Sequence, residues 1–358
     1  MYTPSSGIEE RICQKATLNH IPISGSLELS PVCNLSCDMC YVRLSPSQMP
    51  ANRPFTAEQW VSLAKELQEA GTMFLQLTGG EPLLYPGFAE VYSALHDMGM
   101  VLTLNTNGTL LNEEWVSFFL KRRPRRINVT LYALNEEGYE DLCHCRAGFA
   151  QTVRALHLLR DNHLDVKLNV SLTPKNLASL DDFYSFAKEL GIPIEVDSYM
   201  FPFCRNGQQF SPSNRLDAKT CAHSTLSCMA NENPSGRERL LEDCKLMREG
   251  MIFPNHNHLL CRAGRSSFFI DWQGNMHPCF AMKGAKCNVF TDGFSSCWEQ
   301  TTSYIKELFL SSTCSSCPMQ HMCLSCPGRA ESETNDPSGT PEYLCQWMRE
   351  ISNYAVSQ

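Results

Sequence analysis

The sequence predicts an α/β fold: a partial (β/α)6 TIM-like barrel followed by a C-terminal cysteine-rich domain. Apolar strand-like runs alternate with helix-period segments between residues 26 and 198, a rhythm typical of a parallel α/β unit. Beyond Ser198 the chain turns to Pro, Asn, Ser and Gly, so the two further repeats of an eight-unit barrel are not evident. The last third has many cysteines and little periodicity, as expected where bound metal replaces a hydrophobic core.

Each strand is expected as a short apolar run, and each helix as the periodic segment that follows it. The expected strands are 26–30, 73–77, 101–105, 127–131, 165–172 and 194–198. The expected helices are 57–70, 87–98, 112–121, 148–161 and 179–190. The resulting division of the chain is an N-terminal segment at 1–25, the barrel at 26–205, a linker or bridging region at 206–255 and the cysteine-rich domain at 256–358.

Charge and hydropathy argue against nucleic-acid and membrane partners. The net charge is −8, with 30 Lys and Arg against 38 Asp and Glu, and neither sign forms a long block. The N-terminus lacks a basic region followed by an apolar stretch, and no run of about 18 apolar residues occurs. We therefore expect a cytoplasmic protein with a small or peptidic partner.

Nineteen cysteines fit metal binding better than disulfides. Their number is odd, and the chain is much longer than a disulfide-stapled mini-domain. Three of them, Cys33, Cys37 and Cys40, lie in a loop just after the first expected strand, and three ligands leave one iron of a cluster open. A structural zinc site is the alternative, but it needs a fourth ligand nearby, and no Cys or His lies between Cys40 and His96.

These three cysteines, followed by Tyr41, resemble the signature of the radical S-adenosylmethionine (SAM) superfamily. The segment Thr78-Gly79-Gly80-Glu81-Pro82 is similar to the family's GGEP element, whose backbone and Glu engage the methionyl amine of SAM. Glycines there let the backbone approach a ligand closely. The resemblance implies a SAM-binding [4Fe-4S] cluster on the three cysteines, which delivers one electron to SAM and releases a 5'-deoxyadenosyl radical.

The resemblance extends to four polar residues near later strand ends. Asn107 belongs to a polar ending of the third strand, Thr130 has the place of a hydroxyl near the ribose, and Asn169 lies on the fifth strand. Arg146 resembles the arginine that pairs with the SAM carboxylate, although the surrounding Cys-His-Cys-Arg departs from the usual wording. Each could instead be an ordinary turn or interior polar residue. Their arrival at the C-terminal ends of successive strands favours a site.

The C-terminal cysteines resemble the SPASM extension of peptide-modifying radical SAM enzymes, an auxiliary iron-sulfur cluster domain. This chain has two residues, Leu324 and Ser325, where that family usually has three. The resemblance implies a nearer cluster, auxiliary I, on Cys261, Cys279 and Cys326. It implies a farther cluster, auxiliary II, on Cys314, Cys317, Cys323 and Cys345. Zinc is the alternative for the paired Cys-x2-Cys units. The fourth ligand of auxiliary I is open among His258, Cys244 and Cys287.

The resemblance implies a maturase of a ribosomally made peptide, forming a thioether or carbon-carbon cross-link or another radical modification. The implied partners are the peptide, a separate leader-binding protein and a reductant such as flavodoxin or ferredoxin. One alternative is a sulfatase-type formylglycine maturase, disfavoured because Phe280 follows Cys279 where such enzymes have Asp. Others are a small-molecule dehydrogenase of the superfamily and a non-catalytic iron-sulfur electron-transfer protein. No proton or radical relay is assigned, since Asp197 and Tyr199, which leave the sixth strand, can equally be structural.

Overall fold

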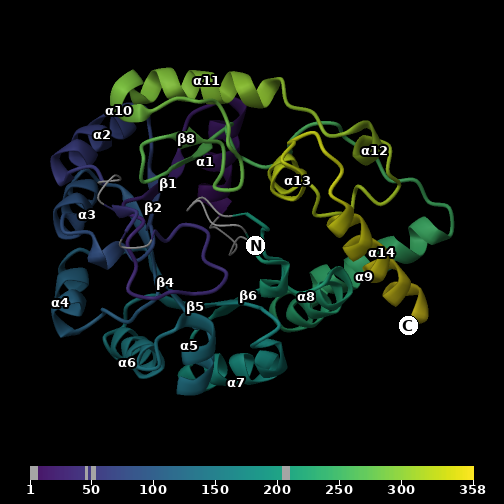
Figure 1. Ribbon diagram of the computed structural model, residues 1–358. Coiled ribbons are helices and arrows are strands. Elements are labelled where there is room, and N and C mark those ends of the chain that lie inside the picture. The colour runs from purple at the N-terminus through teal and green to yellow at the C-terminus, as the bar shows by residue number, and fades with distance from the viewer. Residues whose placement is uncertain (1–6, 45–46, 50–53, 204–209) are drawn as a thin grey trace.

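An open eight-stranded sheet forms the centre of the molecule (Figure 1). The computed structural model describes residues 7–44, 47–49, 54–203 and 210–358. The strand order is β6-β5-β4-β3-β2-β1-β7-β8, parallel throughout except for the β7–β8 pair. The strands are β1 (Ser24–Glu28), β2 (Phe74–Thr78), β3 (Val101–Thr106), β4 (Arg126–Thr130), β5 (Val166–Ser171), β6 (Ile194–Asp197), β7 (Ser267–Ile270) and β8 (Met276–His277). The six expected strands are confirmed to within two residues, and β7 and β8 were not foreseen.

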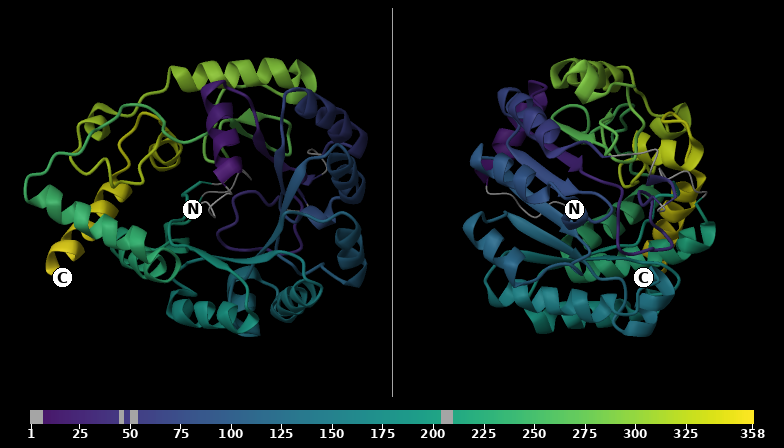
Figure 2. Two further views of the ribbon diagram at one scale, coloured as in Figure 1. Left: turned by 180° about the vertical axis from the view of Figure 1, so that it is seen from behind. Right: turned by 60° about the vertical axis from the view of Figure 1, so that its left-hand side comes forward.

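Helices cover the outer face of the first six strands (Figures 1 and 2). They are α2 (Ala57–Glu69), α3 (Phe88–Asp97), α4 (Glu113–Lys121), α5 (Glu136–Cys143), α6 (Gly148–Asp161) and α7 (Leu180–Leu190). Their starts follow sequence chemistry: Thr56 forms a capping box with Gln59, and the Asn112 side chain accepts the backbone N–H of Trp115. The short α5 was not predicted, and Asn135 caps it through the N–H of Gly138.

The two faces of the sheet differ in character. Leu27, Leu77 and Leu104 point outward and are at most 1% exposed beneath the helices, each stabilising the fold by about 1.5–3 kcal/mol. The inner face carries a hydrogen-bonded polar row instead. Its side-chain bonds are Ser26 to Gln76 at 3.1 Å, Gln76 to Asn105 at 3.1 Å and Asn128 to Asn105 at 2.7 Å. The interior of the partial barrel is therefore a polar surface suited to a ligand.

The interval predicted as a linker or bridging region contains two long helices, α8 (Ala218–Glu232) and α9 (Pro234–Arg248). Both pack against the C-terminal helix α14 (Glu342–Ser357). Trp347 donates its indole N–H to Thr225 Oγ1 at 3.2 Å, and Arg248 Nε donates to Ser352 Oγ at 2.9 Å. Sequence reasoning missed these helices because buried cysteines, which pack as small apolar residues, replace the usual apolar periodicity.

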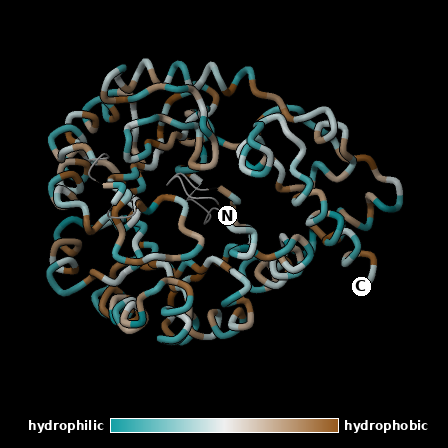
Figure 3. The backbone as a smooth tube through the Cα atoms, viewed as in Figure 1, coloured by the Kyte–Doolittle hydropathy of each residue, from teal (hydrophilic) through white to brown (hydrophobic). Residues whose placement is uncertain are grey.

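The remaining helices enclose the cysteine-rich region and one edge of the sheet. They are α1 (Gly7–Leu18), α10 (Val289–Asp292), α11 (Phe294–Lys306), α12 (Ser312–Ser315) and α13 (Pro327–Thr334). Glu66 of α2 accepts the N–H of Phe294 at 2.8 Å, which fixes the start of α11 on the barrel. Within the described ranges no helix is both long and apolar enough to span a bilayer. Figure 3 shows hydrophobic and hydrophilic positions interspersed along the chain.

Candidate functional site

The loop after β1 carries Cys33, Cys37 and Cys40 as partly buried thiols. Backbone N–H groups of Leu35 and Arg43 donate to the sulfurs of Cys33 and Cys40 at 3.4 and 3.3 Å. Burial raises the pKa of Cys33 to about 12 and also raises the pKa of Cys40. These thiols are protonated without metal, so bound iron would have to displace the protons.

The same loop is held in place from three sides. Ser36 N–H and Asp38 N–H donate to the carbonyls of Cys143 and Leu142, at the end of α5, at 3.0 and 3.1 Å. The Asp38 carboxylate accepts from Lys175 Nζ at 2.9 Å and lies 2.7 Å from His144 Nε2. Side chains held this way lose little entropy on binding, so the loop is preorganised for its ligand.

Gly79 and Gly80 bring the loop after β2 into contact with the cysteine loop. The N–H groups of Gly80 and Glu81 donate to the carbonyls of Ser30 and Val32, both at 2.8 Å. A Cβ on Gly79 would lie 2.5 Å from Ser30 O, and one on Gly80 would lie 2.4 Å from Val32 O. Both contacts are shorter than any side chain tolerates, so close approach of two backbones explains the glycine pair.

Glu81 is fully buried, and its carboxylate is engaged within the protein. It accepts Thr106 Oγ1 at 2.8 and 2.9 Å, Asn107 N–H at 2.8 Å and Leu83 N–H at 3.1 Å. Burial raises its pKa to about 7, against the lowering effect of these hydrogen bonds. The side chain thus ties the loop after β2 to the end of β3, and the contact of Glu81 and the loop backbone with the methionyl amine of SAM stays a prediction.

One of the predicted SAM residues, Asn107, contacts the cysteine loop, and two others, Thr130 and Asn169, pair with each other on the sheet. Asn107 Nδ2 lies 3.7 Å from Cys33 Sγ and donates to Asn34 Oδ1 at 3.0 Å. Thr130 and Asn169 are paired neighbours on β4 and β5. Among the described residues, the buried Oδ1 of Asn169 has no hydrogen-bond partner. Such an unpaired acceptor fits a ligand hydroxyl, because a buried acceptor that forms no hydrogen bond costs about 1–3 kcal/mol.

Arg146 is placed differently from the role that the resemblance implied. Its guanidinium forms ion pairs with Glu136 and Glu137 in the first turn of α5, and its side chain is 55% exposed. The structure does not bring it to Asn107 or Asn169. Pairing of Arg146 with the SAM carboxylate stays a prediction, which the mutation below tests.

The C-terminal cysteines gather in the two sets that the resemblance implied. Cys279 interacts electrostatically with Cys261 and Cys326, and Cys323 does so with the second set, Cys314, Cys317 and Cys345. Burial raises the pKa of Cys279 to about 12 and that of Cys323 to about 11. Ser325 N–H donates to Cys323 Sγ at 3.4 Å. The assignment of these sets to clusters stays a prediction.

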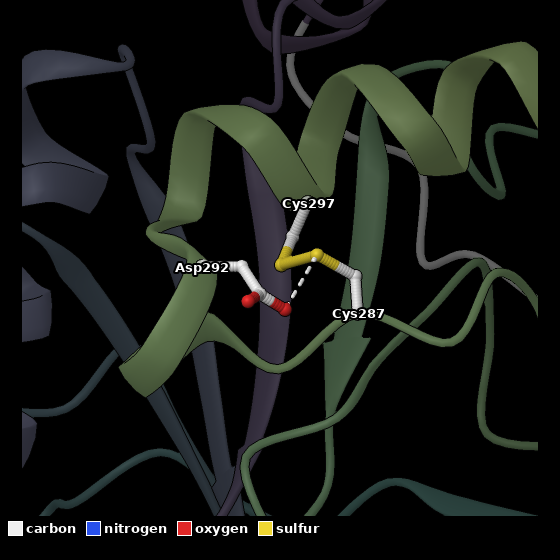
Figure 4. Close-up of side chains that lie close together, drawn as sticks. All are labelled: Cys287, Asp292 and Cys297. Carbon is white, nitrogen blue, oxygen red and sulfur yellow. Dashed lines mark hydrogen bonds between the residues drawn. A yellow bond between two sulfur atoms is a disulfide. The ribbon is translucent and has the colours of Figure 1, made fainter.

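The three candidates for a fourth auxiliary I ligand have other partners. Cys287 forms a disulfide with Cys297, beside the Asp292 carboxylate (Figure 4). Cys244 Sγ lies 3.6 Å from Met322 Sδ, and His258 Nδ1 lies 3.3 Å from Asn257 Oδ1.

Two features escaped sequence reasoning. The side chains of Cys143 and Tyr132 both contact the Cys37 thiol. The hydrogen bond with Cys143 raises the pKa of Cys37 most, and burial raises it further. Tyr41 belongs to a group of aromatic rings in which Phe201 and Phe203 follow β6. The only sequence signal for Cys143 was its place in the unusual Cys-His-Cys-Arg segment.

The donors fit a multi-iron cluster. Across the described residues, one group of His, Cys, Asp or Glu is compact enough for a single ion, namely Cys287, Asp292 and Cys297. The three thiols of the loop after β1 are not all within 4.8 Å of one another, so they do not form a compact single-ion group. Three cysteine thiols over the C-terminal ends of parallel strands, backed by a Gly-Gly loop, define a partial-barrel protein built to hold such a cluster.

Comparison with known proteins identifies the domain that holds the three thiols. Residues 27–187 match the Radical SAM superfamily, so this part of the chain is a radical SAM domain. It is 25% identical over 326 residues to an AdoMet-dependent heme synthase of Methanosarcina barkeri, covering 86% of this chain and 92% of the relative. It is 26% identical over 333 residues to the mycofactocin maturase MftC of Mycobacterium ulcerans, covering 90% and 88%. The crystal structure of Streptococcus suis SuiB shares the fold, with a TM-score of 0.68 and 17% identity over 96% of this chain and 84% of SuiB.

Proposed function

We propose that this chain is a peptide-modifying radical SAM enzyme with three [4Fe-4S] clusters. SAM bound at the open iron of a cluster on Cys33, Cys37 and Cys40 would accept one electron and yield the 5'-deoxyadenosyl radical that abstracts a substrate hydrogen. The chain's own residues bind and orient SAM. Gly79 and Gly80 place backbone against SAM, and Asn169 offers its acceptor.

The observation that carries the proposal is the meeting of two cluster-binding loops. Tyr41 follows Cys40 and Phe280 follows Cys279, and their ring centroids are 6.0 Å apart. A substrate between these loops would face both the SAM site and auxiliary I. The electron left after hydrogen abstraction would then have an acceptor close by, which suits an oxidative modification.

A peptide substrate is favoured because the mycobacterial relative, aligned over most of both chains, is a maturase. The proposed bond is a thioether, a carbon-carbon cross-link or another side-chain modification. A flavodoxin or ferredoxin would supply electrons, and a separate protein would bind the leader.

A second candidate is the reaction of the Methanosarcina relative, AdoMet-dependent heme synthesis, favoured because the alignment covers 92% of that protein. Formylglycine formation is not favoured. Phe280 lies where such maturases have Asp, and a phenyl ring accepts no proton.

The test is anaerobic reconstitution followed by counting of iron and sulfide and by dithionite-driven SAM cleavage. About twelve irons, four per cubane, are expected, with 5'-deoxyadenosine formed by the wild type and lost in a Cys33, Cys37, Cys40 triple alanine variant. About four irons together with tightly held zinc would show that the C-terminal cysteines bind zinc in place of the auxiliary clusters. Absence of cleavage would refute the proposal, and turnover of a tetrapyrrole but of no peptide would establish the second candidate.

A further inference from the structure

Four aromatic side chains gather where the two cluster-binding loops meet. This aromatic cluster consists of Tyr41, Phe201, Phe203 and Phe280. Ring centroids are 5.4 Å apart for Tyr41 and Phe203, 4.9 Å for Phe201 and Phe280, and 6.1 Å for Phe203 and Phe280. These separations suit edge-to-face and tilted ring contacts. The cluster joins the segments after Cys40, after β6 and after Cys279.

One member of the aromatic cluster, Phe280, borders a cavity. All four rings remain partly exposed. The cavity that Phe280 lines has a volume of about 440 Å³ and extends along the inner face of the sheet past Gln76, Asn128 and Lys167. A cavity of this size accommodates a small ligand or one peptide side chain, and partly exposed aromatic walls are typical of such sites.

A guanidinium lies against the same rings. Arg329 follows Cys326 by three residues, and its Cζ is 5.0 Å from the centroid of Tyr199 and 5.8 Å from that of Phe201. Its Nη1 donates to Leu324 O at 2.6 Å. In the described part of the chain, its buried Nε has no hydrogen-bond partner. A buried N–H of a charged group left without an acceptor is costly, so an acceptor supplied by a ligand would be favoured.

The carboxylates near Arg329, those of Glu333 and Asp197, leave its Nε without an acceptor. Glu333 accepts both Arg215 nitrogens, at 2.8 and 3.1 Å, and the Tyr199 hydroxyl at 2.8 Å. The carboxylate of Asp197 is accessible, but surrounding protein and then the charge of Glu195 raise its pKa. Neither carboxylate accepts the buried Nε of Arg329, so Arg329 can attract an anion from outside the chain.

We propose that the aromatic cluster and Arg329 select the substrate: they bind a residue that presents a flat apolar or aromatic side chain together with a carboxylate. The rings bind the side chain and the Arg329 guanidinium binds the carboxylate, next to both cluster-binding loops. An aromatic cage can also hold a cation, but Arg329 already lies over Tyr199 and Phe201, and a second positive charge would be repelled. This inference rests on the proposed function and names the substrate class of that site.

The experiment measures binding of small probes to the iron-loaded, SAM-bound enzyme without oxygen, by equilibrium dialysis. N-acetyl-tyrosine carries both features, N-acetyl-tyrosinamide lacks the carboxylate, and N-acetyl-alanine lacks the ring. We expect N-acetyl-tyrosine to bind at least about tenfold more tightly than either of the others, since a hydrogen bond to a charged group contributes about 1.5–3 kcal/mol. N-acetyl-aspartyl-tyrosinamide separates a side-chain carboxylate from a C-terminal one.

Variants assign the two features to their residues. Arg329→Gln should reduce the preference for acid over amide to about twofold or less, and Arg329→Lys should retain part of it as a point charge without the fork. Phe280→Leu should weaken both tyrosine probes and leave N-acetyl-alanine unchanged. Arg160→Gln, an exposed arginine on α6, is the matched control, and iron content and circular dichroism verify each fold.

Equal binding of acid and amide by the wild type, or an unchanged preference in Arg329→Gln, would overturn the inference. Cleavage of SAM without any probe preference would refute the inference alone. Probe preference without SAM cleavage would instead refute the proposed function alone. Failure of both would show that the cavity is no substrate site.

Discussion

The buried carboxyl of Glu81 should make the stability of the protein depend on pH. The change to test is Glu81→Gln, which removes the titrating proton and keeps a side chain of the same shape. In the folded protein burial raises the pKa of Glu81 to about 7, from 4.5 for the free side chain. The folded state therefore binds this proton more tightly than the unfolded state does.

The sign follows from that difference. Because the folded pKa lies above the unfolded one, the stability associated with the proton is fully present below about pH 4.5 and is lost as pH rises through about 7. Each pKa unit corresponds to about 1.4 kcal/mol, so the full loss is about 3 kcal/mol. Between about pH 5.5 and about pH 8 the loss from Glu81 is about 2 kcal/mol.

The assay is urea unfolding of the wild type and Glu81→Gln in the same iron-loaded state, followed by tryptophan fluorescence under nitrogen. The free-energy difference between them should move by about 2 kcal/mol in favour of Glu81→Gln from about pH 5.5 to about pH 8. Other titrating groups are common to both proteins and cancel. Infrared difference spectra should show the protonated Glu81 carboxyl disappearing near pH 7. A flat difference, or a carboxyl that ionises below about pH 5, would refute the reasoning.

Three further changes test the site. Gly80→Ala places a Cβ 2.4 Å from Val32 O and should cost about 2–4 kcal/mol and lower the iron content, whereas Gly7→Ala meets nothing within 4 Å and serves as the control. Arg146→Ala should melt at the same temperature as Arg160→Ala and bind SAM with a dissociation constant within about twofold of that control, because the exposed ion pairs of Arg146 are weak; a tenfold loss of SAM affinity would support the carboxylate role. Cys345→Ser should remove about four irons per chain and leave SAM cleavage intact, and unchanged iron would contradict the auxiliary II assignment.

The barrel was predictable because its signals are local. Apolar and polar residues alternate along β2, β3, β5 and β6, and each following helix begins near a capping residue or a proline. The two C-terminal strands were not predicted, although β7 is an apolar run of Ser-Phe-Phe-Ile. Its partner β1 lies far away in the sequence, so nothing near residue 267 reveals the pairing.

The candidate site was predictable where spacing carries the chemistry. The cysteine groups follow from intervals along the chain, and the close approach of Gly80 to Val32 agrees with a glycine-rich loop. The inward direction of Glu81, the ion pairs of Arg146 and the aromatic cluster do not follow from spacing. They depend on how distant segments pack, and Phe201 and Phe280 meet only after the chain has returned to β1.

The pairing of β7 with β1 determines where the two cluster-binding loops meet. Ser24 to Leu27 lie in parallel register with Ser267 to Ile270, so both segments leave the sheet in the same direction. β1 leads directly to the cysteine loop, whereas β8 is antiparallel and turns the chain back, so that Cys279 and Phe280 line the cavity on the inner face. The fit between these strands is tight, because a Cβ on Gly25 would lie 2.2 Å from the Phe268 ring. Since hydrogen bonds between strands shift only in steps of whole residues, the register of this strand pair fixes the separation of the loop that carries Cys40 from the loop that carries Cys279, and the rings of Tyr41 and Phe280 meet between them.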